Sequence, residues 1–86
     1  MQERIIVGVN LLDRIHEAPE FQKILTDYGC NIKTRLGLHE VDEKMCSTSG
    51  LILLELFGDD RRCQELIQKL EAFEQIEVRK MVFTRP

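Results

Sequence analysis

Alternating apolar and polar positions predict four β-strands along the chain, over residues 4–10, 30–37, 51–57 and 76–83. In the first stretch Ile5, Val7 and Val9 share one face. In the third, Ile52, Leu54 and Leu56 form a wholly apolar face. Because these two stretches are the most apolar, we expect them to be the central strands of a sheet.

The second and fourth stretches carry mixed faces. On 30–37 we expect Cys30, Ile32 and Leu36 to point inward and Asn31, Lys33 and Arg35 to point outward. On 76–83 the inward residues are Ile76, Val78 and Val82. The positions predicted to be almost wholly buried are Val7, Val9, Ile24, Ile32, Leu54, Leu56, Ile67, Leu70 and Val78.

Two segments show helical periodicity instead. Phe21, Ile24, Leu25 and Tyr28 follow the spacing of one helical face. This helix has two possible starts: Asp13 as N-cap, or Pro19 in the first turn. Gly29 is expected to end it as a residue with positive φ. Asp59 or Asp60 caps a second helix, whose apolar stripe is Cys63, Leu66, Ile67, Leu70 and Phe73.

The two halves of the chain repeat the same strand–helix–strand order. Ile6 corresponds to Ile52, and Phe21 corresponds to Ile67. Two such halves usually interleave into one antiparallel sheet with both helices on the same face. The expected fold is therefore an α+β, ferredoxin-like βαββαβ domain over residues 1–86, with a four-stranded antiparallel sheet.

Composition narrows the classes of partner. The chain has 86 residues and a formal net charge of −3, whereas nucleic-acid-binding domains carry a clustered basic face. No apolar run approaches the roughly 18 residues of a membrane span, and the N-terminus does not resemble a signal peptide. We therefore expect a cytoplasmic protein that contacts neither nucleic acid nor membrane. Its three cysteines should stay reduced, with Cys30 and Cys63 in the core.

A set of segments resembles a known family. An Ile/Val-rich first strand, Tyr28-Gly29 at a helix end, residues 33–37 (KTRLG), residues 47–50 before a run of aliphatics, and the closing Val78-Arg79-Lys80 together resemble the iron-only hydrogenase system regulator family. The resemblance implies a stand-alone ferredoxin-like domain, similar in shape to ACT domains and to the C-terminal domain of the nickel-responsive repressor. It also implies a link to hydrogenase maturation, without implying a ligand.

Two departures limit what this resemblance carries over. ACT amino-acid sites typically use a glycine in the loop after the first strand, and residues 10–14 contain none. The nickel repressor's metal set needs several histidines, and this chain has two.

The connection over residues 38–50 holds most of the chemical candidates. A plain hairpin needs two to five residues, and this connection has about a dozen. A solvated acidic loop is the preferred interpretation. The alternatives are a divalent transition-metal site with His39 and Cys46 as ligands, and a loop that docks an organic ligand or a partner. The candidate ligand-binding residues are Asn10, Asp13, Ser47, Ser49 and Gly50.

Catalysis is not expected. Cys46 with His39 is the one pairing of a nucleophile with a base, and no third orienting group can be named for it.

Self-association is expected, because two helices on one face leave the other face of the sheet bare. The apolar residues predicted there are Ile6, Leu51, Leu53, Phe57, Met81 and Phe83. The rim is predicted to be Arg4, Lys33, Arg35 and Arg79. The expected function is that of an oligomeric regulatory or sensor domain that binds a small ligand or metal and acts through a protein partner. The alternative is a structural or assembly subunit without a ligand.

Overall fold

The computed structural model describes residues 3–11, 19–41 and 46–84, with side chains described outside 38–41 and 46–49. The elements are β1 (Glu3–Leu11), α1 (Pro19–Asp27), the 3-10 turn η2 (Gly29–Asn31), β2 (Ile32–Val41), β3 (Cys46–Leu56), α2 (Asp60–Glu71) and β4 (Ile76–Thr84). The strands form one antiparallel sheet in the order β2-β3-β1-β4. The predicted ferredoxin-like fold, with the first and third strands in the centre, is confirmed.

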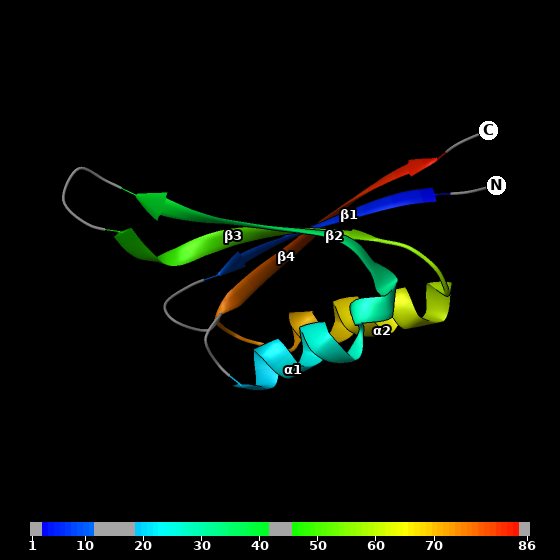
Figure 1. The fold of residues 1–86 in the computed structure, drawn as a ribbon, viewed down its shortest axis with the longest axis horizontal. Coiled ribbons are helices and arrows are strands. Elements are labelled where there is room, and N and C mark those ends of the chain that lie inside the picture. Colours follow the sequence, from blue (N-terminus) through cyan, green and yellow to red (C-terminus); the bar gives the residue numbers. More distant parts are fainter. Residues whose placement is uncertain (1–2, 12–18, 42–45, 85–86) are drawn as a thin grey trace.

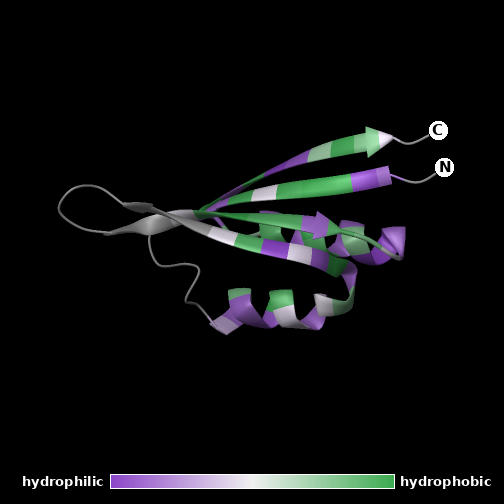
Figure 2. Cartoon of the chain, turned by 45° about the horizontal axis from the view of Figure 1, so that its top comes forward, coloured by the Kyte–Doolittle hydropathy of each residue, from purple (hydrophilic) through white to green (hydrophobic). Residues whose placement is uncertain are grey.

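The molecule has two layers. Both helices lie against the same face of the sheet, and among the described elements none covers the opposite face (Figure 1). We call that opposite face the outer face. Figure 2 shows apolar colour along β1 and in the last part of β4. Among the described residues, neither helix is long and apolar enough to cross a membrane.

The core lies between the sheet and the helices. Val7, Val9 and Leu54 are fully buried there, together with Phe21, Leu66 and Leu70 from the helices. Of the nine predicted core residues, six are buried: Val7, Val9, Leu54, Leu56, Ile67 and Leu70. Ile24, Ile32 and Val78 are partly buried and pack against the core from its margin.

Each helix begins at a residue that the sequence offered as a possible start. Asp59 caps α2, since its carboxylate accepts a hydrogen bond from the Arg61 N–H at 2.9 Å. In α1 the first residue is Pro19, which lacks an N–H and loses nothing at this position. The other possible start, Asp13, lies outside the described residues.

The turn after α1 differs from the prediction. Gly29 does not adopt a positive φ, and it opens η2 instead of ending the helix. The strand therefore begins two residues later than predicted, at Ile32. Cys30 stays in the turn and is exposed, so its predicted core position is wrong. Asn31 takes the buried position, where hydrogen bonding compensates for its polar side chain.

A bulge at the start of β2 reverses the predicted faces of that strand. Ile32 pairs with Leu56 and Thr34 pairs with Glu55, so Lys33 is an extra residue on β2. From there Leu36 pairs with Leu53, which places it on the outer face, half exposed. By the same register Arg35 moves to the helix side. The predicted inward direction of Leu36 is wrong, because alternation carries no signal for an inserted residue.

One further expectation is corrected at the connection between β2 and β3. The predicted long loop is largely strand, since His39 pairs with Gly50 and Val41 pairs with Cys46. On β4 the predicted inward direction of Val82 is confirmed by its pairing with the buried Ile5, although Val82 is 43% exposed. It lies on the edge strand β4, whose C-terminal half rises away from the helices (Figure 1).

Candidate functional site

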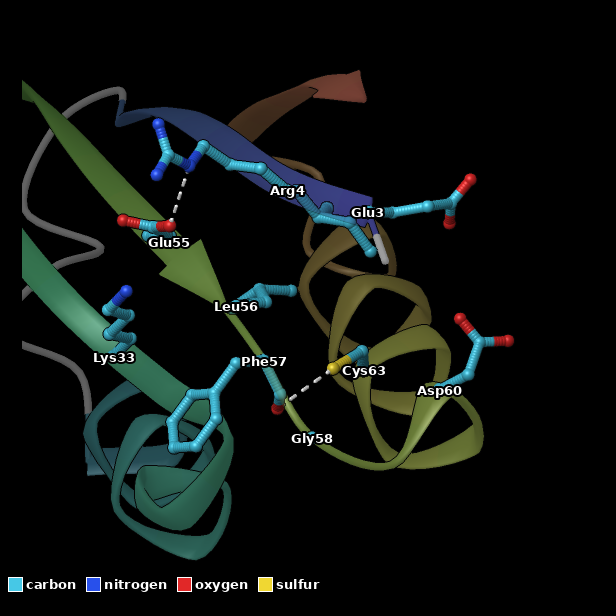
Figure 3. Close-up of a pocket in the computed structure, with 10 residues that line it drawn as sticks. Glu3, Arg4, Lys33, Glu55, Leu56, Phe57, Gly58, Asp60 and Cys63 are labelled. Atoms are coloured by element: carbon cyan, nitrogen blue, oxygen red, sulfur yellow. Dashed lines mark hydrogen bonds and ion pairs between the residues drawn. The ribbon is translucent and has the colours of Figure 1, made fainter. Parts of the chain in front are cut away.

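An open cleft of about 710 Å³ lies at one end of the sheet (Figure 3). It forms where β1 begins and β3 ends, beside the first turn of α2. Ile5 and Leu56 supply apolar walls, and the chain between β3 and α2 supplies Phe57 and Gly58. The cleft is therefore lined from both layers of the molecule: by the central strands β1 and β3, by the edge strand β2 through Lys33, and by the start of α2.

One side of the cleft is basic. The Arg4 Nε donates to the Glu55 carboxylate at 3.2 Å, which neutralises that carboxylate. Lys33, from the β2 bulge, extends toward the same region in Figure 3 and makes no ion pair with another described residue. The phenyl ring of Phe57 lies on this side and is half exposed. This side therefore offers one ammonium group and one accessible aromatic ring.

The other side of the cleft is acidic. Glu3 and Asp60 line it, from the start of β1 and the first turn of α2. In Figure 3 they lie across from Lys33 and Phe57, with Leu56 and Cys63 between. The cleft therefore has a positive end and a negative end separated by an apolar floor.

Cys63 lies in the floor as a neutral thiol. Burial raises its pKa above the usual thiol range, and the charges of Asp60 and Asp59 act in the same direction. Its Sγ–H donates to the Phe57 carbonyl oxygen at 3.4 Å. A thiol with a raised pKa is a poor nucleophile, so Cys63 acts here as a packing and hydrogen-bonding group.

A polar clip holds the turn that carries Phe57. The Phe57 N–H donates to the Asn31 carbonyl oxygen at 3.0 Å. The Asn31 side-chain amide donates to the Phe57 carbonyl oxygen at 3.2 Å. The next residue, Gly58, has a φ of 95°, which glycine tolerates best. The backbone of Phe57 is thus held from η2 as well as from β3.

The residues predicted to bind a ligand do not gather in this cleft. Asn10 lies at the opposite end of β1, where its side-chain amide donates to Glu77 at 2.9 Å. Gly50 is buried in β3 between Leu11 and His39. Asp13 lies outside the described residues, and the side chains of Ser47 and Ser49 are outside the described part.

The predicted metal site stays a prediction. His39 and Cys46 lie on adjacent strands of the β2–β3 hairpin, where Cys46 pairs with Val41 rather than with His39. Their side chains are outside the described part of the structure. Among the residues whose side chains are described, no three His, Cys, Asp or Glu residues are grouped as metal ligands.

The predicted apolar surface lies on or beside the outer face. Phe57, Met81 and Phe83 are each about half exposed, at 51%, 55% and 51%. Ile6, Leu51 and Leu53 are partly buried, since neighbouring strands flank them. Leu36 joins this surface at 50% exposure.

Sequence reasoning missed the cleft. Lys33 was assigned to the rim of the outer face, Phe57 to its apolar surface, and Asp60 to a solvated helix start. One signal could have pointed to the cleft. The Gly58-Asp59-Asp60 turn directly follows a central strand, and ligand sites often form where strand ends meet helix starts. The bulge that brings Lys33 to the cleft left no such signal.

Comparison with known proteins supports the fold. No protein-family model matches the chain, and no curated protein matches it as a relative. An uncharacterized protein from Thermotoga maritima has a similar solved structure, with a TM-score of 0.76 and 20% identity over 96% of this chain and 100% of that one.

Two larger proteins contain a similar unit. One is a formyltetrahydrofolate deformylase from Pseudomonas putida, with a TM-score of 0.53 and 16% identity over 96% of this chain and 29% of the deformylase. The other is the C-terminal domain of a cyclometallase involved in the synthesis of the cofactor of lactate racemase. It has a TM-score of 0.55 and 15% identity over 99% of this chain and 57% of that one. At these identities the likeness concerns the fold alone.

Proposed function

We propose that this chain is a small regulatory or sensor domain that binds a small ligand in the cleft and acts through protein partners. The observation that carries the proposal is the charge arrangement of the cleft. Lys33 lies at one end, Glu3 and Asp60 at the other, and an apolar floor separates them. Sites for small molecules typically combine apolar walls with a few placed polar groups.

The charges define the class of ligand. An anionic group would pair with Lys33, and a cationic group would pair with Asp60 or Glu3. A flat or apolar part would lie on Phe57 and Leu56. The best match is therefore a small dipolar molecule with one acidic and one basic group. This site lies at the opposite end of β1 from Asn10 and Leu11, next to which an ACT-type effector would bind.

The resemblance of the sequence segments to the iron-only hydrogenase system regulators supports a link to hydrogenase maturation. The ferredoxin-like fold agrees with this resemblance. Deleting the gene for this chain in its host should then change the activity of an iron-only hydrogenase. Unchanged hydrogenase activity would contradict the link to hydrogenase maturation. It would not contradict the proposed ligand site.

The ligand site is tested by thermal unfolding against amino acids, nucleotides and divalent metals. A compound that binds only the folded chain raises its melting temperature. We expect a dipolar compound to do so, with Lys33→Ala abolishing the shift. Lys80→Ala is the matched control, since Lys80 is an exposed lysine on β4 outside the cleft. The proposal fails if no compound shifts the melting temperature, or if both variants lose the shift equally.

A metal response would indicate the hairpin instead. Zinc, nickel, cobalt and iron are the metals to include, because imidazole and thiolate ligands suit them. If a metal raises the melting temperature and His39→Ala and Cys46→Ser each remove the effect, the sensor function belongs to the hairpin and not to the cleft.

An assembly role without a ligand is the second candidate. It is favoured by the exposed apolar side chains on the outer face, which a purely ligand-binding domain would not need. A chain that associates but responds to no compound of the panel would have this role.

A further inference from the structure

The outer face carries three projecting apolar side chains. Leu36 from β2, and Met81 and Phe83 from β4, are each half exposed or more. The register places them on the same side of the sheet as Ile6 and Leu53. An exposed apolar surface of this kind usually marks an interaction site.

The same face also contains a hollow. Gly8 lies in the central strand β1 and has no side chain, so a depression of about 160 Å³ forms around it. Leu51 of β3 borders the depression on one side, and Glu77 and Arg79 of β4 border it on the other, with Asn10 further along β1. The face therefore has both projections and a receiving hollow, as a self-complementary surface requires.

The charges on the outer face are already balanced. Arg4 pairs with Glu55 at 3.2 Å, and Arg79 pairs with Glu77 at 3.7 Å. Asn10 also donates to Glu77 at 2.9 Å. These two arginines and two glutamates cancel, although the whole chain has a net charge of −3. A strongly charged partner protein would therefore find no opposite charge to pair with on the outer face. A second copy of the same face, whose charges are also paired, would not be repelled.

We propose that a second copy of this chain covers the outer face. The two sheets pack face to face about a twofold axis, so that projecting side chains of one copy enter the hollow at Gly8 of the other. Isologous contacts of this type need one patch that matches itself in shape and charge. The projecting side chains, the hollow at Gly8 and the internally paired charges of this face support such a contact. The inference stands apart from the ligand site, because it does not require the cleft to be occupied.

Three substitutions on one strand test the proposal by sedimentation velocity. The wild-type chain should be a dimer at high micromolar concentration. Met81→Glu and Phe83→Glu should each convert it to a monomer, because a charge would be buried without a partner. Val82→Glu is the matched control. Val82 lies between the two, is 43% exposed, and points to the helix side of the sheet. This variant should remain dimeric.

A fourth substitution tests the hollow. At Gly8 an added Cβ would meet the Leu53 Cδ2 at 3.8 Å and the Arg79 carbonyl oxygen at 3.9 Å, which are ordinary contacts. Gly8→Val should therefore fold, as judged by circular dichroism and an unchanged melting temperature when dilute, and it should fill the hollow and weaken the dimer.

The outcomes separate the alternatives. A wild-type monomer overturns the proposal and leaves the face for a different protein. Loss of the dimer in Val82→Glu as well would indicate pairing along the edge of β4, which also overturns it. Dimers in all four variants would place the contact elsewhere on the molecule.

Discussion

Asn31 and Phe57 hold each other through two hydrogen bonds, although 25 residues separate them in the sequence. One bond joins the Phe57 N–H to the Asn31 carbonyl oxygen, and the other joins the Asn31 side-chain amide to the Phe57 carbonyl oxygen. The pair ties η2 to the turn before α2. It also holds the backbone of Phe57, the one aromatic side chain among the described residues that line the cleft.

Replacing Asn31 by alanine should lower the unfolding free energy by about 0.5 to 1.5 kcal/mol, because the Phe57 carbonyl oxygen would lose its amide donor and keep only the weaker Cys63 thiol donor. Chemical denaturation of wild type, Asn31→Ala and the control Cys30→Ala at equal protein concentration measures the change in unfolding free energy. Cys30→Ala is the control: Cys30 is the preceding residue and is exposed. Equal unfolding free energies of Asn31→Ala and wild type would mean that the hydrogen bond from the Asn31 side chain makes no net contribution to stability.

Substituting Gly58 should lower the stability of the chain more than substituting Gly37. Its φ is 95°, and an added Cβ would lie 3.0 Å from the Asn31 side-chain nitrogen. Gly58→Ala should therefore cost at least about 1 to 2 kcal/mol. Gly37→Ala has open space around the new Cβ, so it should be neutral or stabilising by up to about 1 kcal/mol. The melting temperatures of the two variants give the comparison. A Gly58→Ala variant as stable as wild type would contradict the positive φ at Gly58.

Leu54 and Leu36 test the assignment of the two faces. Leu54 is fully buried under the helices, so Leu54→Ala should cost about 2 to 5 kcal/mol. Leu36 is half exposed on the outer face, so Leu36→Ala should change stability by about 0.5 kcal/mol or less in dilute, monomeric chain. Urea unfolding gives both values. Similar losses in the two variants would contradict the register across β2 and β3.

The raised pKa of Cys63 predicts a loss of stability at alkaline pH. Below the ordinary thiol pKa of 9.0 both the folded and unfolded chains carry a neutral thiol, so its contribution is fully present. As the pH rises above that value, the unfolded thiol ionises while the folded one stays neutral, and unfolding becomes easier until the raised folded pKa is reached.

Cys63→Ala should therefore flatten the pH dependence of the unfolding free energy between about pH 8 and 10. The pKa of Tyr28 is also raised by burial, but from 10.0, so its effect begins at higher pH. Parallel declines of wild type and Cys63→Ala in this range would show that another group is responsible.

Periodicity was sufficient to predict the central part of the fold. Alternation in the first and third strands set the buried faces correctly, because both strands lie inside the sheet and one face of each meets the helices. The α2 cap was narrowed to Asp59 or Asp60 because an acidic residue after a glycine break is a strong local signal. These features depend on short-range chemistry that the residues themselves specify.

The errors concern places where tertiary structure overrides local pattern. The bulge at Lys33 inserts one residue, and residues 34–37 of β2 then change face, including Leu36. The polar composition of residues 38–50 suggested a loop, yet backbone pairing with the neighbouring strand continues through much of it. The candidate site depends on the same bulge, because Lys33 reaches the cleft from there.

The central strand β1 has a consequence for the order of folding. Its partners lie far away in sequence, as in the pairs Ile5–Leu56 and Glu3–Thr84, whereas Val41 and Cys46 join across a short connection. Closing a long loop costs entropy before any contact compensates for it. The β2–β3 hairpin can therefore form early on its own. The strand β1 precedes both of its partners in the sequence, so it must wait for β4 before its pairing is complete.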